Sequence, residues 1–462
     1  MLNRRRFMQS IVAAAATPAL TNGCVSNVVL ADSLVPDAER ILDLPPGYTY
    51  TVISRRGELM ADGLPVPGAH DGMAAFAADN GRIILVRNHE LSSGWLNTSH
   101  YAKSCKKLPA TTLSRFYDRG SDETPGLGGT TTTIYDPVSR TVERQFLSLG
   151  GTDYNCAGGR TPWGSWLTCE ESFANPGNGF SHDRSRHVFD KRHGYVFEVP
   201  SAATDLITAV PLKAMGRFTH EAAAVHEATG IVYLTEDQWH SLFYRFIPTI
   251  PGQLHRGGRL QALAITGQPG QSTYNWPGKN VGLNQPLSTH WINLENVDGK
   301  VDDLRQRGAA AGAATFARGE GLTAAGDEFA FTCTNGGPAR LGQIFSYKPS
   351  PFEGGEMERD SPGQLTLIAQ SSRNSLLKNC DNLTQSPWGD LIVCEDLVGD
   401  SKNCSLVGMR PDGSQYLLAN NAYSASELAG VCFSPDGKTM FLNIQYPGMT
   451  LAITGDWPAS LF

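Results

Sequence analysis

The chain of 462 residues lacks several features that would place it in a common class. Only 18% of its residues are charged, and acidic residues outnumber basic ones by 45 to 38, so no basic surface favours nucleic-acid binding. No apolar run beyond the N-terminal segment approaches the roughly eighteen residues that span a bilayer, so we expect no transmembrane segment in the mature protein. The nine cysteines follow no compact disulfide framework, and neither a P-loop nor a Gly-x-Ser-x-Gly motif is present.

A recurring hairpin pattern fills much of the chain instead. Two segments contain a Pro-Trp-Gly turn and then a short apolar run that ends in a cysteine and two acidic residues, at Cys169-Glu-Glu171 and Cys394-Glu-Asp396. Aligning these segments on the turn glycine reveals four weaker copies. The six turn glycines are Gly81, Gly164, Gly230, Gly326, Gly389 and Gly437.

Metal-ligating residue types occur at the same end of each predicted hairpin. The incoming strands carry Asp71, Cys156, Glu221, Glu320, Asp381 and Glu427, six to ten residues before the glycine. Six to seven residues after it come acidic pairs such as Glu170 and Glu171, Glu236 and Asp237, and Glu395 and Asp396. So many carboxylates in a small volume repel one another unless cations are bound. Oxygen donors favour hard cations such as Ca²⁺, Mn²⁺ or Fe³⁺, and Cys156 favours a transition metal nearby.

Six similar hairpins predict an all-β fold, a six-bladed β-propeller with loop or helical insertions over one face. We expect a single domain over residues 40–462, with insertions near 91–130 and 250–316, where glycine, proline, serine and asparagine are frequent. The segments Tyr48–Ile53 and Met449–Thr454 alternate as strands. Their pairing would close the ring.

The N-terminus resembles a twin-arginine export signal over residues 1–31, with Asn3-Arg-Arg-Arg-Phe-Met8 before a small and apolar run. We therefore expect export of the folded protein by the twin-arginine machinery to the periplasm or the cell exterior. Cys24 is a candidate lipid-attachment site.

Each candidate ligand also has a purely structural interpretation. A single carboxylate could be a solvated loop residue, Cys156 a buried core thiol, and Arg318 a salt-bridge partner of the acidic ring. His89 and His220, each beside a glutamate, could be structural or act as ligands. A shift of one residue in register decides which member of an acidic pair faces inward.

With these motifs identified, the chain resembles the PhoX-type alkaline phosphatases, a family of exported bacterial metalloenzymes. The marks of the resemblance are Asn88-His-Glu90, Asn155-Cys-Ala-Gly-Gly159, Thr161-Pro-Trp-Gly164, Cys169-Glu-Glu171 and Arg318-Gly-Glu320. It implies a propeller that holds a pair of ferric ions together with roughly two or three calcium ions. The implied iron ligands are Cys156, Glu171, Glu236 and Glu320, with Glu170 as the alternative to Glu171.

The resemblance also implies that Arg318 and Asn88 contact the phosphate of a small phosphate monoester. Calcium ligands chosen by position are Glu90, Glu221, Asp237, Glu395 and Asp396. The expected reaction is attack by a metal-activated oxide or hydroxide, in a protein we expect to be a monomer. Gly319 and Gly321 depart from the family pattern, which has bulkier residues around Glu320.

Two other functions remain open from the sequence. One is a calcium-dependent phosphodiesterase, lactonase or sugar-ester hydrolase on a similar six-bladed scaffold. The other is a propeller that only binds a partner, against which the dense acidic mouth argues.

Overall fold

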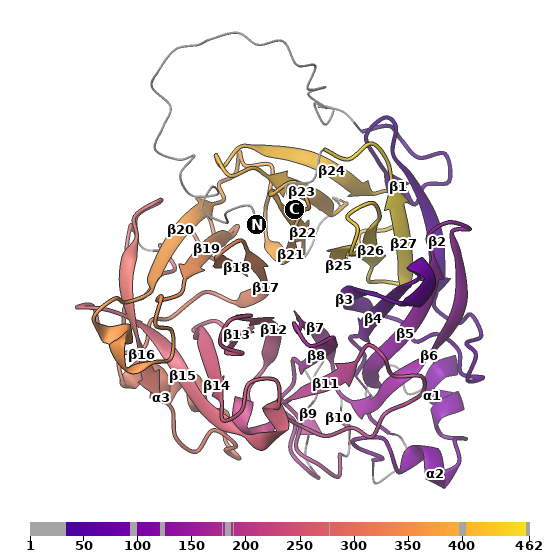
Figure 1. Cartoon of the computed structure of the whole chain (residues 1–462), viewed down its shortest axis with the longest axis horizontal. Helices are drawn as coiled ribbons and strands as arrows, with labels where there is room; N and C mark the ends of the chain where they lie inside the picture. The colour runs from indigo at the N-terminus through magenta and orange to yellow at the C-terminus, as the bar shows by residue number, and fades with distance from the viewer. Residues whose placement is uncertain are drawn as a thin grey trace.

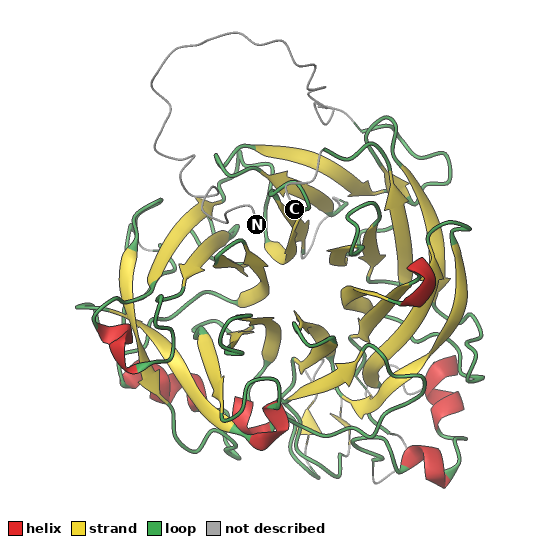
Figure 2. Cartoon of the chain, viewed as in Figure 1, coloured by secondary structure: helices red, strands yellow, loops and turns green. Residues whose placement is uncertain are grey.

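The structure, a computed structural model, describes residues 34–92, 99–120, 125–177, 179–180, 186–187, 189–276, 278–396 and 403–458. Strands dominate these residues, and the helices are few and short (Figure 2). The predicted export signal, with Cys24, lies outside the described residues.

The strands form antiparallel meanders in which most strands pair with the next along the chain. One sheet contains β3 (His70–Ala77), β4 (Ile83–His89), β5 (Gly128–Asp136) and β6 (Thr141–Thr152). A three-stranded sheet contains β7 (Asn155–Arg160), β8 (Ser165–Glu170) and β11 (Val196–Pro200). β9 (Gly179–Phe180) and β10 (Arg186–His187) pair separately.

A nine-stranded sheet consists of two meanders joined at their outer edges. The first meander is β12 (His220–Val225), β13 (Val232–Glu236), β14 (Tyr244–Pro248) and β15 (Gly258–Ile265). The second is β17 (Gly319–Ala325), β18 (Glu328–Cys333), β19 (Gln343–Lys348) and β20 (Gln364–Gln370). β16 (Leu287–Asn293) pairs with both β15 and β20 and so connects them.

The C-terminal part of the chain forms two further sheets. One orders β1 (Leu42–Asp43), β24 (Gln415–Asn421), β23 (Ser405–Met409), β22 (Leu391–Glu395) and β21 (Cys380–Gln385). The other orders β2 (Thr49–Arg55), β27 (Met449–Thr454), β26 (Met440–Ile444) and β25 (Leu428–Phe433). Both sheets therefore include a strand from the start of the described chain.

The six predicted hairpins are confirmed. β3–β4, β7–β8, β12–β13, β17–β18, β21–β22 and β25–β26 are antiparallel pairs, and each connection contains its predicted glycine. All six glycines have positive φ, between 65° and 96°, a conformation that side chains with a Cβ atom rarely adopt. The glycines therefore determine where the chain reverses.

The first strand of each hairpin lies at the centre of the molecule (Figure 1). β3 contacts β7, β7 contacts β12, β12 contacts β17, β17 contacts β21, β21 contacts β25, and β25 contacts β3. These inner strands form a closed ring, around which the sheets radiate in a propeller-like, all-β arrangement. Large apolar clusters fill the spaces between neighbouring sheets, such as the cluster of Ile392, Leu406, Met440 and Leu451.

Strands from distant parts of the sequence close the ring, as expected. β2 pairs with β27 from Thr49 opposite Thr454 to Arg55 opposite Met449. This pairing gives β27 a partner on its outer side, so the last meander is completed by residues from the start of the domain.

The two predicted insertions differ from each other. Residues 99–120 include α1 (His100–Cys105) and α2 (Ala110–Leu113), which pack on the apolar cluster of Met60, Leu64 and Val66. The interval 250–316 contains β15, β16 and α3 (Leu304–Ala310) between longer stretches of loop. On β15, alternate residues Leu260, Ala262 and Ala264 are buried on one face, as expected for a strand. The glycines and prolines around this strand make its pattern hard to recognise in the sequence.

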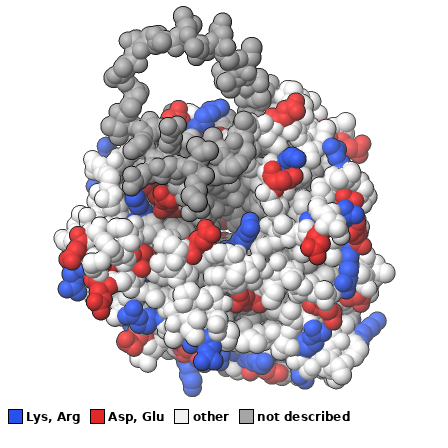
Figure 3. Space-filling model, in the orientation of Figure 1, with Lys and Arg blue, Asp and Glu red and all other residues white. Residues whose placement is uncertain are grey.

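Short 3₁₀ turns are Asp79–Gly81, Lys213–Met215, Leu254–Arg256 and Glu356–Arg359. No helix within the described ranges is long and apolar enough to cross a membrane. On the face seen in Figure 3, acidic and basic side chains are interspersed and do not gather into an area of one sign.

Candidate metal centre

The inner strands begin around a cavity of 940 Å³ that is rich in carboxylates. Its acidic lining residues are Asp71, Glu90, Glu171, Glu221, Asp237, Glu320, Asp381, Asp396 and Glu427. Cys156, Tyr154, Gln238, Trp239, Gln445 and Tyr446 also line it, and among the described lining residues Arg318 alone is a lysine or arginine. The predicted convergence at one end of the hairpins is therefore present.

A β-bulge positions the incoming row of ligands. In the hairpins of β3, β7, β12, β17 and β21, the pairing register shifts immediately after the first residue of the inner strand. The residue that follows is Asp71, Cys156, Glu221, Glu320 or Asp381. Such bulges bend a strand and redirect a side chain, which here reaches the cavity. Glu427 directly precedes β25, and this strand has its bulge one residue later.

Strand ends position the outgoing row. β4, β8, β13 and β22 end at His89, Glu170, Glu236 and Glu395. The next residue in each case lines the cavity, and these residues are Glu90, Glu171, Asp237 and Asp396. Because successive side chains of an extended chain point to opposite sides, the two members of each acidic pair have different environments.

Three groups of side chains have the composition and spacing of a metal site. They are Cys156, Glu171 and Glu221; Asp71, Glu90 and Glu427; and Glu221, Glu320 and Asp381. Within each group, the potential ligand atoms lie within 4.8 Å of one another. Glu221 belongs to two groups and therefore connects them.

Burial and mutual repulsion of these carboxylates favour the binding of positive charge. Burial raises the pKa of Asp71 to about 7, and burial together with repulsion from Asp237 raises the pKa of Glu171 well above its usual range. Burial and then Asp381 have the same effect on the pKa of Glu221. Oδ1 of Asp71 and Oε2 of Glu221 are buried without a hydrogen-bond partner. Buried carboxylate oxygens that accept no hydrogen bond are available as metal ligands. Because all these ligands are oxygen atoms, they fit hard cations.

Cys156 is the only thiol that lines the described cavity. It is 4% exposed, and burial followed by repulsion from Glu221 and Glu171 raises the pKa of its thiol well above the usual value. Its Sγ lies 3.3 Å from the carbonyl oxygen of His220. Without a metal this thiol stays protonated, whereas a bound transition metal stabilises the thiolate.

Arg318 lies between two cavity carboxylates. Its Nε and one terminal nitrogen donate to Oδ1 and Oδ2 of Asp237 at 2.7 and 2.8 Å, and the same terminal nitrogen is 2.8 Å from Oε1 of Glu320. The other terminal nitrogen donates to Oδ1 of Asn335 at 3.4 Å. Burial lowers the pKa of Arg318, but Glu320 and Asp237 outweigh this effect and raise it, so the guanidinium stays charged.

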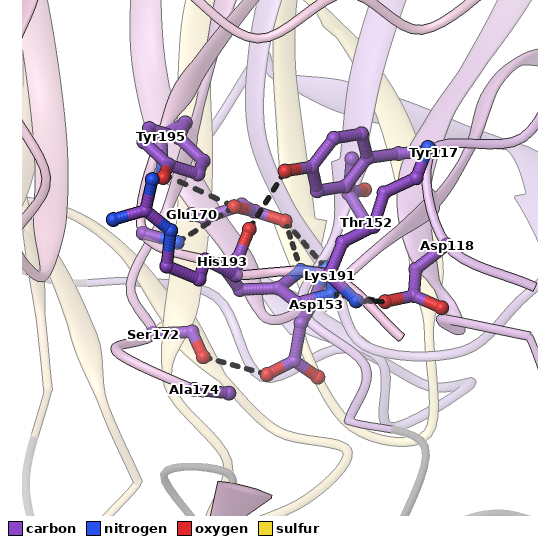
Figure 4. A network of polar contacts seen from close by, with 12 residues as sticks. Tyr117, Asp118, Thr152, Asp153, Glu170, Ser172, Ala174, Lys191, His193 and Tyr195 are labelled. Atoms are coloured by element: carbon purple, nitrogen blue, oxygen red, sulfur yellow. Dashed lines mark hydrogen bonds and ion pairs between the residues drawn. The ribbon is translucent and has the colours of Figure 1, made fainter. Parts of the chain in front are cut away.

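Glu170 does not reach the cavity and is part of a separate buried network (Figure 4). Its Oε1 accepts hydrogen bonds from His193 Nδ1 at 2.7 Å and from the Asp153 amide at 3.0 Å, while Oε2 accepts from the Gly194 and Tyr195 amides. Nε2 of His193 is 3.2 Å from Oδ2 of Asp118. Glu170 therefore anchors the end of β8, and its neighbour Glu171 faces the cavity.

Glu236 and Glu395 are likewise turned away from the cavity. Glu236 accepts hydrogen bonds from the Tyr244 hydroxyl at 2.7 Å and from Arg305 at 3.2 Å. Glu395 accepts the backbone amides of Lys378 and Ser405 at 2.8 and 3.0 Å. In each pair the first residue satisfies groups in the protein and the second lines the cavity.

Asn88, the expected phosphate contact, is fully buried and does not line the cavity. Its amide group donates to the carbonyl oxygens of Cys156 and Ala157 at 2.9 and 2.7 Å. Its Oδ1 accepts from Trp166 and Thr168, both at 2.8 Å. Because protein groups use this hydrogen-bonding capacity, the side chain holds β7 in place and with it Cys156.

His89 and His220 also have structural environments. The His89 ring is 2.9 Å from both the Gly68 carbonyl oxygen and the Thr131 hydroxyl. The His220 ring stacks on Phe218 with centroids 3.6 Å apart. Neither residue lines the cavity.

Several cavity residues were not selected as ligands from the sequence. Asp71, Asp381 and Glu427 have the same position on the incoming strand as Glu221 and Glu320. This shared position indicates that they are ligands as well. Gln445 follows the end of β26 as Glu90 follows β4, so the same alignment could have identified it. Tyr154 and Trp239 carried no comparable signal, because they lie outside both rows.

The inner strands form a closed ring, and one mouth of the ring holds clustered carboxylates and the thiol of Cys156. This arrangement defines a propeller-like protein with a candidate cation centre. The chain belongs to the alkaline phosphatase PhoX family, whose sequence model matches residues 29–448. It is therefore an enzyme of the alkaline phosphatase class, as the motifs indicated. No curated protein matches the chain in sequence.

Solved structures of similar fold include PhoX of Pseudomonas fluorescens in complex with vanadate, a transition state analogue. It is 19% identical, the match covers 94% of this chain and 99% of that one, and the TM-score is 0.67. A gluconolactonase of Xanthomonas campestris is 10% identical over 93% of this chain and 99% of its own, with a TM-score of 0.41. The periplasmic gluconolactonase of Pseudomonas aeruginosa is 13% identical over 89% and 92%, with a TM-score of 0.42.

Proposed function

We propose that this enzyme hydrolyses phosphate monoesters in the acidic cavity, with cations held by its carboxylates and by Cys156. The observation that supports the proposal best is the carboxylate-lined cavity, in which Oδ1 of Asp71 and Oε2 of Glu221 are buried without a hydrogen-bond partner. An anionic phosphate cannot approach so many carboxylates unless cations neutralise them first. A calcium-dependent diesterase, a lactonase or a binding module gives Cys156 no role.

The three groups of candidate ligands differ in chemistry, which suggests different metals. Cys156, Glu171 and Glu221 combine a thiol with oxygen donors and suit iron. Asp71, Glu90 and Glu427 offer only oxygen and suit calcium, as do Glu221, Glu320 and Asp381. This proposal changes two of the iron ligands that the family resemblance implies. Glu221 replaces Glu236, whose carboxylate contacts Tyr244 and Arg305, and Glu320 joins a calcium group.

Arg318 would bind and orient the phosphate. Its planar guanidinium is held by Asp237, Glu320 and Asn335, and its one remaining terminal N–H can donate to an oxygen of a phosphoryl group. Bound cations would supply charge neutralisation and a Lewis acid at the phosphate oxygens. Tyr154 and Tyr446 also line the cavity.

The overall architecture is proposed to be a six-bladed propeller, with the nine-stranded sheet counted as two blades that β16 joins. The closed ring of six inner strands supports this count. We further propose that residues 1–31 direct twin-arginine export to the periplasm or beyond, and that the mature enzyme is a monomer. The arginine-containing N-terminal pattern supports the export proposal.

Metal analysis combined with activity assays tests the proposed function. The full chain, produced in a host with twin-arginine export, is expected to contain iron and calcium and to release phosphate from monoesters. A calcium chelator should abolish turnover, and added calcium should restore it. Turnover of lactones or diesters in preference to monoesters would contradict the proposal.

Cys156→Ser tests the assignment of the thiol. This variant should lose most of its iron per folded molecule, because serine is a much poorer ligand for a transition metal. Cys169→Ser is the matched control, since Cys169 is a buried thiol on β8 that does not line the cavity. Equal iron content in both variants would show that Cys156 is not a ligand.

A further inference from the structure

An exposed indole stands at the edge of the acidic cavity. Trp239 lines this cavity together with Asp237 and Arg318, and 51% of its surface is exposed. The ring of Trp239 contacts that of Trp276 edge-on, with centroids 5.7 Å apart. A large apolar surface at the opening of a highly charged site suits a ligand that is itself partly apolar.

The second indole is held rigidly. Nε1 of Trp276 donates to the Asn335 carbonyl oxygen at 2.6 Å, and the ring lies 4.6 Å from that of Tyr274. The Arg340 guanidinium lies over the Trp276 ring, 4.7 Å from the ring centroid. We call Trp239, Trp276 and Tyr274 the aromatic wall.

The aromatic wall is connected directly to the proposed phosphate clamp. The Arg318 amide donates to the carbonyl oxygen of Gln238, the residue before Trp239, at 3.0 Å. The Arg318 side chain donates to Asn335, whose carbonyl oxygen also fixes Trp276. Because Trp239 and Arg318 both line the cavity, a phosphate ester bound at Arg318 can place its alcohol part against Trp239.

We propose that Trp239 determines specificity, favouring phosphate monoesters whose alcohol carries a planar aromatic ring system such as a nucleobase. The proposal rests on the proposed phosphatase function and adds its substrate class. A flat ring can stack on the exposed indole face, and a neutral ring brings no additional negative charge toward the carboxylates. Esters of small aliphatic alcohols lack this contact.

The test compares two esters that differ only in the ring system. Adenosine 5′-monophosphate and ribose 5-phosphate both lose phosphate when water cleaves the same kind of P–O bond at a primary alcohol. The measured quantity is kcat/KM for adenosine 5′-monophosphate divided by kcat/KM for ribose 5-phosphate. Trp239→Ala should lower this ratio about ten-fold, a typical effect of losing one base-stacking contact. Trp239→Phe should keep most of the preference, because a flat ring remains.

Phe352→Ala is the matched control, since Phe352 is an aromatic residue that is 40% exposed and does not line the acidic cavity. Its ratio should equal that of the wild type. An equal loss for both esters in Trp239→Ala, or no change in the ratio, would overturn the proposal.

Calorimetric binding separates this inference from the proposed function. If the metal-loaded wild type hydrolyses neither ester, the phosphatase proposal fails. Titration with the same two esters then decides about Trp239. Tighter binding of adenosine 5′-monophosphate that is lost in Trp239→Ala supports the aromatic wall, and equal binding by both proteins refutes it.

Discussion

At the scale of single residues, Arg318 combines two properties that rarely occur together. It is fixed by Asp237 and Glu320, yet 23% of its side chain remains exposed toward the cavity. A preorganised cation needs little rearrangement when negative charge develops on a bound phosphate. Its importance for turnover should therefore exceed its importance for folding.

Arg318→Ala is expected to lower kcat/KM for a phosphate monoester about 100-fold, as the loss of a preorganised donor does elsewhere. The melting temperature of the cation-loaded protein should change little. Arg82→Ala is the control, because Arg82 forms an exposed ion pair with Glu143. A collapse of the melting temperature with normal activity per folded molecule would show that Arg318 is structural.

The sequence could locate the acidic pairs but not their orientation. Glu170 and Glu171 are the same residue type, and only the position at which β8 ends decides which of them meets His193 and which meets the cavity. That position depends on hydrogen bonds from Gly194 and Tyr195, more than twenty residues away in the chain. The position of Asn88 outside the cavity has a related reason, since its partners Cys156 and Trp166 come from another hairpin.

At the scale of elements, the bulged inner strands pack so closely that glycine is required beside some ligands. A Cβ atom on Gly321 would lie 2.6 Å from the Asp381 carbonyl oxygen, and one on Gly72 would lie 2.6 Å from Cα of Ala157. These atoms belong to the backbone of the neighbouring inner strand and cannot rotate away. The glycine at 321 thus lets β17 approach β21.

Gly321→Ala should lower the free energy of unfolding by about 1–3 kcal/mol, as overpacking of a close contact does. It should also weaken cation binding, because Glu320 and Asp381 belong to the same ligand group. Chemical denaturation and calcium titration measure the two effects. Gly299→Ala is the control, since a Cβ atom there meets nothing closer than 3.4 Å; equal stability of the two variants would argue against the tight contact.

The network around His193 makes the end of β8 sensitive to alkaline pH. Burial lowers the pKa of His193, but Glu170 and Asp118 outweigh this effect and raise it to about 10, above the ordinary 6.5. Because the pKa of His193 is higher in the folded than in the unfolded chain, the protonated residue stabilises the fold. This stabilisation is fully present below pH 6.5 and is lost as the pH rises toward 10.

We therefore expect the free energy of unfolding to fall from pH 7 to pH 10, by at most about 1.4 kcal/mol per pH unit from this residue. His193→Gln should be less stable at pH 7 and should lose less on alkalinisation. Denaturant titrations at several pH values test this, with His290→Gln on β16 as the control. Parallel pH profiles of wild type and His193→Gln would contradict the expectation.

The hairpins themselves were predictable because a turn glycine with positive φ leaves a strong local signal. The bulges were not, because they arise where neighbouring inner strands meet and have no sequence mark of their own. β15 and β16 were missed for a similar reason, since glycines and prolines around them read as loop.

At the scale of the whole molecule, bound cations should stabilise the folded state. Carboxylates from several sheets, such as Glu90, Glu221 and Asp396, repel one another across the cavity. Ions that bind only the native ring stabilise it by mass action, by about 2.7 kcal/mol at a concentration of 100 Kd.

Removing calcium with a chelator should therefore lower the melting temperature by several degrees, and restoring calcium should reverse the change. Thermal denaturation monitored by circular dichroism measures this. Glu221→Gln should show a smaller calcium effect, whereas Glu227→Gln, outside the acidic cavity, should behave like the wild type. A melting temperature that is indifferent to calcium in the wild type would contradict the role of cations in stability.

The group of Asp71, Glu90 and Glu427 joins the first hairpin of the ring to the last. Residues 71–427 must therefore all be synthesised before this group can assemble. Truncated chains that lack the region around Glu427 keep the other two carboxylates but have no complete set of three. Retention of an ion at this position would thus report that the first and last hairpins of the ring have met.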